Sequence, residues 1–210
     1  MRFISQTSSD GVTEQFFTLD QVPGALWTPE GARGTRSLIL RGPRRQAAQD
    51  GPRHRVPRTP LRRRGLAVVA IDAPNHGDRP QDEEFGRIAA TMRASMAAGE
   101  NPGALVAGMH SYLADQAVAD WQAVLTAVQR LDHVGVGPVG YCGMSMGCGI
   151  GIPLIAAEPR IRAAHKTAVL GAPAGTRSGR RVRVGAVLAG SDTERSGVVV
   201  RSGRRRAATC

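Results

Sequence analysis

The stretch "VGYCGMSMGCGIG", residues 139 to 151, decides the fold prediction for this chain. It opens with a short apolar run of the kind found in buried strands, and residues 146 to 158 have a composition that suits a helix. Ser145 stands between the two, with Gly143 and Gly147 two positions away on either side. Glycines at these positions allow a sharp turn from strand to helix, so we predict that Ser145 lies at its apex.

A serine at such an apex has a defined chemistry. Its hydroxyl points off the edge of the sheet, and the N–H of Met146 lies at the start of the helix, where it can stabilise a developing oxyanion. The five-residue pattern is weak evidence by itself, but a strand before it and a helix after it support the interpretation. The alternative is a glycine-rich packing turn that carries no chemistry.

The rest of the chain alternates between strand and helix patterns. We predict a strand pair over residues 16–31, buried strands over 36–42 and 66–71, a helix with a cap between 78 and 111, and an amphipathic helix over 111–131. Strands that alternate with helices in this way indicate an α/β protein with a predominantly parallel sheet and helices on both faces.

Length and hydropathy favour a single domain. A chain of 210 residues has room for one well-buried core. Its N-terminus lacks the apolar run of a signal peptide, and no later segment has the continuous apolar length of a membrane span. We therefore expect a cytoplasmic protein without a membrane partner, and the sequence leaves its oligomeric state undetermined.

The net charge of +11 is concentrated in two segments. Residues 41–64 contain nine arginines against Asp50 alone, and residues 160–210 contain eleven arginines and one lysine against two acids, so the remainder of the chain is acidic. Surfaces that bind nucleic acid usually mix lysine with arginine and add aromatic platforms for bases. The two segments hold a single lysine and no aromatic residue, which argues against a nucleic-acid partner.

Four stretches together resemble the α/β-hydrolase superfamily, in particular its dienelactone-hydrolase-like and esterase-like members. They are "VPGALWTPEG", "GLAVVAIDAPNHGDR", "ADWQAVLTAVQRL" and "VGPVGYCGMSMG", and the resemblance covers residues 12–40 and 65–163. It implies an α/β-hydrolase fold and the hydrolysis of a small-molecule carboxylic ester or lactone through a Ser145 acyl-enzyme. It also implies that neither a cofactor nor a metal is needed.

The same resemblance assigns roles to particular residues. Ser145 would be the nucleophile and the Met146 N–H an oxyanion donor, with Gly143 and Gly147 as the glycines of the turn. Gly42 matches the oxyanion loop, although Pro43 follows it where the family has a histidine, and proline has no N–H to donate. Asp192 follows an apolar run in the place expected of the triad acid.

The general base is left unassigned, because each of the five histidines has an ordinary structural interpretation. We expect His54 to be solvated within the arginine-rich segment and His76 to lie in a turn. His110 is expected in the cap region before a helix, and His133 in a loop before the next strand. His165 is expected at the strand end opposite the catalytic edge.

The chain departs from the family pattern where its arginine-rich segments lie. We divide it into an α/β-hydrolase core over residues 1–163, with an irregular insert at 41–64, and an Arg/Gly-rich segment over 164–210 that is poorly ordered or holds residual strands. The composition is typical of a shifted reading frame in a GC-rich gene. We therefore expect residues 41–63, and those from about 164 onward, to be out of frame, with C-terminal strands and a helix missing or degraded and catalysis impaired.

Two alternative functions remain open at this stage. The first is a noncatalytic protein whose arginine-rich segments bind nucleic acid or other polyanions. The second keeps the nucleophilic serine but transfers the acyl group to an acceptor other than water.

Overall fold

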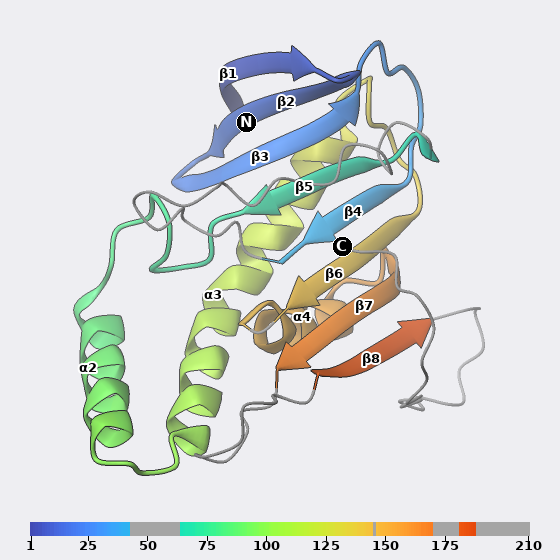
Figure 1. Cartoon of the computed structure of the whole chain (residues 1–210). Coiled ribbons are helices and arrows are strands. Elements are labelled where there is room, and N and C mark those ends of the chain that lie inside the picture. The colour runs from blue at the N-terminus through green and yellow to red at the C-terminus, as the bar shows by residue number, and fades with distance from the viewer. Residues whose placement is uncertain (43–63, 145, 170–180, 188–210) are drawn as a thin grey trace.

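A computed structural model describes residues 1–42, 64–144, 146–169 and 181–187. Within them one sheet is covered by helices (Figure 1). Its strands are β1 (Arg2–Ser9), β2 (Val12–Leu19), β3 (Val22–Pro29), β4 (Leu38–Arg41), β5 (Ala67–Ile71), β6 (Val139–Met144), β7 (Ile161–Val169) and β8 (Arg181–Val187). The helices are α2 (Glu83–Ala97), α3 (Gly103–Gln129) and α4 (Met146–Ala157).

The sheet is parallel only at its centre. The strand order is β1-β2-β3-β5-β4-β6-β7-β8. The strands β5, β4, β6 and β7 run parallel to one another, whereas β1, β2 and β3 on one side and β8 on the other are antiparallel to their neighbours. The prediction of a predominantly parallel sheet therefore holds for the four central strands, and the sheet as a whole is mixed.

The described helices cover one face of this sheet. Side chains of α3 such as Trp121 and Leu125 pack with Ile150 of α4 against alternate residues of the strands, including Leu40 and Val69. The residues that point to the opposite face form a second, smaller apolar cluster, to which no described helix contributes: Val12, Ala25, Trp27, Val68 and Ala70. Helices on both faces were expected, and within the described residues this arrangement is found on one face only.

Several boundaries differ from the predictions. Helix α3 begins at Gly103, so His110 lies inside it and not in a cap region before it. Strand β1 was not predicted, because all eight of its residues are exposed and carry no apolar alternation. His165 belongs to β7, where it pairs with Cys142 of β6, and β7 runs across the domain boundary proposed at residue 163.

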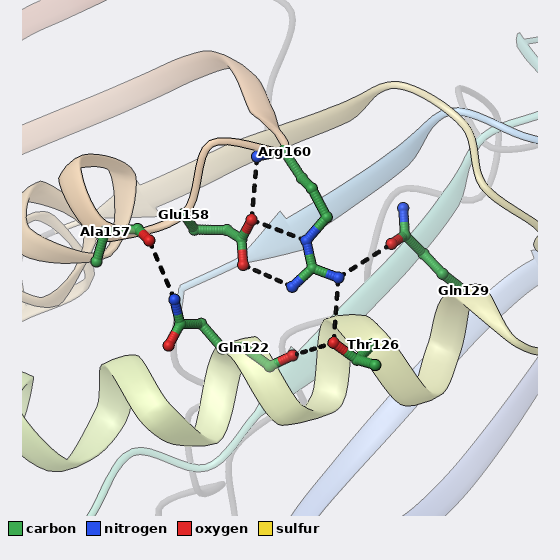
Figure 2. A network of polar contacts seen from close by, with 6 residues as sticks. All are labelled: Gln122, Thr126, Gln129, Ala157, Glu158 and Arg160. Carbon is green, nitrogen blue, oxygen red and sulfur yellow. Dashed lines mark hydrogen bonds and ion pairs between the residues drawn. The ribbon is translucent and has the colours of Figure 1, made fainter.

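A polar cluster joins α3 to the connection between α4 and β7 (Figure 2). Glu158 is almost fully buried, and its carboxylate accepts bonds from Nε and Nη2 of Arg160 at 2.8 and 2.6 Å. The remaining guanidinium nitrogen, Nη1, donates to Thr126 and Gln129 of α3 at 3.1 and 3.3 Å. These bonds hold the C-terminal end of α4 against α3, which also restrains the direction of the α4 axis.

No helix in the described part of the chain is long and apolar enough to cross a membrane.

Candidate functional site

The carboxyl ends of the parallel strands meet at one edge of the sheet. Strand β6 ends at Met144 and α4 begins at Met146, so the chain passes from strand to helix across the single residue Ser145. Ser145 itself lies outside the described residues. The neighbouring parallel strand β4 ends at Arg41, and β5 ends at Ile71. Ligands of open α/β sheets bind at this edge, and the sequence places the candidate nucleophile there.

Glycines pack closely around the ring of Tyr141 beneath this strand-to-helix passage. A Cβ atom added at Gly151 would lie 2.3 Å from Cε1 of Tyr141, and one added at Gly143 would lie 2.7 Å from the same atom and 2.5 Å from the carbonyl oxygen of Gly147. The Tyr141 hydroxyl donates a 2.6 Å bond to that carbonyl oxygen. The glycines predicted to permit the turn therefore also provide the space in which strand and helix approach.

Gly42 lies in the same glycine cluster. A Cβ atom there would come within 3.1 and 3.2 Å of the Cα atoms of Gly147 and Gly143. Its own N–H donates to the carbonyl oxygen of Cys142 at 2.6 Å, which extends the sheet ladder by one residue. The N–H of Gly42 is therefore engaged in the sheet, and the space beside its Cα is filled by the backbone of the other two glycines.

Met146 is the first residue of α4, where the leading N–H groups of a helix have no partner within the helix. Its side chain is partly buried and packs against the main core. Within the same first turn, the thiol of Cys148 donates to the carbonyl oxygen of Gly143 at 3.5 Å. The positive end of the α4 dipole thus faces the edge of the sheet at which β6 ends.

The loop after β5 is tightly constrained. Asp72 is fully buried and accepts a 3.0 Å bond from the N–H of Asp78. Gly77, between them, has a φ of +66°, and a Cβ atom there would lie 2.3 Å from Cγ of Asp72. A residue with a side chain would therefore be strained by its backbone conformation and would also collide with the carboxylate.

Asp82 then connects this loop to two helices. One carboxylate oxygen caps α2 by accepting the N–H of Phe85 at 2.7 Å, and the other accepts from Asn75 at 3.1 Å and from the hydroxyl of Tyr112 on α3 at 2.7 Å. The backbone bond from Phe85, followed by the bond from Tyr112, lowers the pKa of Asp82 below its usual value. This hub was not predicted, although an aspartate directly before "EEF" is a sequence signal for a helix cap.

A cavity of about 250 Å³ opens beside this hub. It is lined almost entirely by polar residues: Gln21, Asn75, Arg79, Pro80, Gln81, Asp82 and Gln116. The charge of Arg79 is balanced by an ion pair with Asp120 of α3. The cavity is smaller than a typical site for a drug-sized ligand and could accommodate only part of one.

The positions and contacts of three histidines are described by the structure. His76 stays in the turn predicted for it, with Nδ1 2.8 Å from the carbonyl oxygen of Pro74. His133 precedes β6 and thus lies near the amino ends of the parallel strands, and its Nε2 is buried without a hydrogen-bond partner among the described residues. His110 packs against α4: a Cβ atom on Gly149 would lie 2.6 Å from both Cγ and Nδ1 of its ring.

The other predicted site features lie outside the described residues. These are Ser145 itself, the proposed acid Asp192, His54, and Pro43 after the oxyanion-loop glycine. The backbone of His165 lies within β7, and its side chain belongs to the part outside the description. Among the residues that the structure does describe, no group of three or more histidine, cysteine, aspartate or glutamate side chains could hold a metal ion.

This arrangement of strands and helices is the α/β-hydrolase fold, and solved structures of hydrolases share it. The chain is similar to a cold-adapted esterase from an Arctic intertidal metagenomic library, with 28% sequence identity and a TM-score of 0.52 for its complex with polyethylene glycol. The zinc-bound structure of an esterase of the same description gives 25% identity and a TM-score of 0.50. Acetyl xylan esterase 1 from a Thermoanaerobacterium species gives 20% identity and a TM-score of 0.49.

The similarity spans part of these proteins. It covers 78% of this chain in all three cases, and 64%, 62% and 50% of the respective esterase chains. This chain therefore matches somewhat less than two thirds of the length of the Arctic esterase. No protein-family model and no curated protein sequence matches the chain.

Proposed function

We propose that this protein is a serine hydrolase that cleaves small carboxylic esters or lactones through an acyl-enzyme on Ser145. The observation that carries the proposal is the passage from β6 to α4 across that single residue, at the carboxyl edge of the parallel strands and within the glycine cluster. Similarity to an esterase at 28% identity supports the same activity.

In the proposed reaction, the Ser145 oxygen attacks the carbonyl carbon and its proton passes to a general base. The charge that develops on the carbonyl oxygen is stabilised by the Met146 N–H at the start of α4. When the ester C–O bond breaks, the base returns the proton to the departing alcohol oxygen, and water then releases the acid in the same manner. Gly42 lies at the same edge, with its own N–H bonded to the carbonyl oxygen of Cys142.

The finer assignments rest on the sequence alone. A dienelactone-like substrate and Asp192 as the triad acid are part of the proposal, and Asp192→Asn is expected to slow turnover if that acid orients a histidine. A shifted reading frame in the arginine-rich segments would impair catalysis. Sequencing the gene and close relatives tests that idea, which fails if the relatives encode both segments without an insertion or deletion.

The activity is tested with a short-chain p-nitrophenyl ester. We expect hydrolysis by the wild-type protein and its loss in Ser145→Ala, while Ser8→Ala, in the exposed strand β1, retains it. Equal rates for wild type and Ser145→Ala, after subtraction of the spontaneous rate, would contradict the proposal.

A further inference from the structure

We propose that the polar cavity beside Asp82 binds one ring of a neutral sugar. The inference goes beyond the proposed function, because the site lies within the described part of the chain and its occupation does not depend on ester hydrolysis. It starts from the convergence of separate segments on a space of about 250 Å³. Gln21 comes from the turn between β2 and β3, residues 75–82 come from the loop after β5, and Gln116 comes from α3.

The loop that forms one wall of the cavity is held in shape by Asn75. This residue is only 3% exposed, and its backbone has a φ of 63°. Its side-chain oxygen accepts the N–H of Asp82 at 2.7 Å, and its amide nitrogen donates to the carboxylate of the same residue at 3.1 Å. Nε2 of Gln81 donates to the Asn75 carbonyl oxygen at 3.3 Å. A wall that is fixed in this way loses little conformational freedom when a ligand binds.

Both charged residues that line the cavity already have partners. Arg79 forms an ion pair with Asp120 of α3. The carboxylate of Asp82 accepts bonds from the first turn of α2, from Asn75 and from the hydroxyl of Tyr112. An ionic ligand would have to displace one of these partners and leave a charge uncompensated. The charge balance therefore favours a neutral ligand.

The remaining polar groups of the lining are amides. Neither the side chain of Gln21 nor Oε1 of Gln81 has a hydrogen-bond partner among the described residues. An amide both donates and accepts hydrogen bonds, and so does a hydroxyl group. Several adjacent hydroxyls on one ring can therefore pair with amides from different segments, whereas an apolar group would leave those amides without partners. The small volume suits a single ring.

The test follows the side-chain amide signals of the full-length protein in ¹H–¹⁵N spectra. Methyl glycosides of glucose, galactose and mannose are titrated separately. We expect at least one of them to shift the signals of Gln21, Gln81 and Gln116 with saturable dependence on concentration, while the signal of Gln6 on the exposed strand β1 stays in place. Cyclohexanol, a ring with a single hydroxyl, and inorganic phosphate should leave all these signals unchanged.

Variants connect the binding to the amides. Gln21→Met and Gln116→Met each remove one exposed amide at nearly constant length, and each should weaken binding about three- to tenfold, as expected for the loss of a neutral hydrogen bond. Gln6→Met is the matched control and should bind like the wild type. The inference is overturned if no glycoside shifts the signals, if cyclohexanol shifts them equally, or if both cavity variants keep the wild-type affinity. Binding of phosphate alone would also overturn it, because that result assigns an anion site at Arg79.

Discussion

Replacing Arg160 with methionine should destabilise the protein by breaking the polar cluster between α3 and the end of α4. The change removes the two guanidinium bonds at 2.8 and 2.6 Å that Glu158 accepts and leaves its carboxylate buried. Hydrogen bonds to charged groups contribute about 1.5–3 kcal/mol each. The Arg160 side chain is 35% exposed, so water compensates part of the loss, and we expect a cost of about 2–3 kcal/mol.

The cost is measured by urea unfolding, where it corresponds to a fall in the midpoint of roughly 1 M. Arg162→Met is the matched control, since Arg162 is exposed on the following strand. A double-mutant cycle with Glu158→Gln should give a coupling free energy of about 1–2 kcal/mol. An Arg160 effect no larger than that of Arg162, or a coupling near zero, would refute the reasoning.

The same pair predicts a pH dependence with a definite sign. The bond from Arg160 lowers the pKa of Glu158 below its usual value of 4.5. A carboxyl group with a lowered pKa in the folded state stabilises the protein fully above its unfolded pKa, and this contribution is lost as the pH falls through the folded value. The difference in unfolding free energy between wild type and Arg160→Met should therefore be constant from pH 6 to 7 and should shrink below about 4.5. A difference that grows on acidification would contradict this sign.

Three further changes probe the edge of the sheet. Gly77→Ala should lower the free energy of unfolding, measured in urea, by about 2 kcal/mol or more, because the residue has a φ of +66° and the new Cβ would lie 2.3 Å from Cγ of Asp72. A decrease under about 0.5 kcal/mol would contradict the close packing of this loop. Tyr141→Phe should cost about 1 kcal/mol by removing the buried bond to the Gly147 carbonyl, and an unchanged midpoint would show that the bond contributes nothing. Asp82→Ala should lower the midpoint of urea unfolding at pH 7. Because the pKa of this carboxyl is lowered in the folded protein, the decrease should become smaller as the pH falls through that pKa. A decrease of equal size at every pH would show that the charged carboxylate is not the stabilising form.

The central part of the fold could be predicted because its strands are apolar, and β5 among them is buried on both faces. The run from Ala67 to Ile71 consists of apolar residues, all buried, so hydrophobicity alone indicates a central strand. The glycine spacing around Ser145 likewise predicted where β6 ends and α4 begins. Strand β1 has no such signal, because it is an exposed edge strand held by its pairing with β2.

The surroundings of the site were harder to predict because they depend on contacts between distant segments. The approach of His110 to Gly149 joins two helices, and nothing in the residues flanking either position indicates it. None of the residues in the first turns of α3, from 103 to 112, is buried, so they lack the buried apolar stripe that marked the helix from residue 111 onward. The bond from Tyr112 to Asp82 spans 30 residues and depends on how α2 and α3 pack.

The most direct test of the central claim is to locate the residue that a fluorophosphonate modifies. Trypsin should release residues 131–160 as one peptide, in which Ser145 is the only serine. We predict that mass spectrometry finds the phosphonyl group on this peptide in the wild-type protein and finds no such adduct in Ser145→Ala. A folded wild-type protein that stays unmodified, or one labelled only on other peptides, would contradict the assignment of Ser145 as the nucleophile.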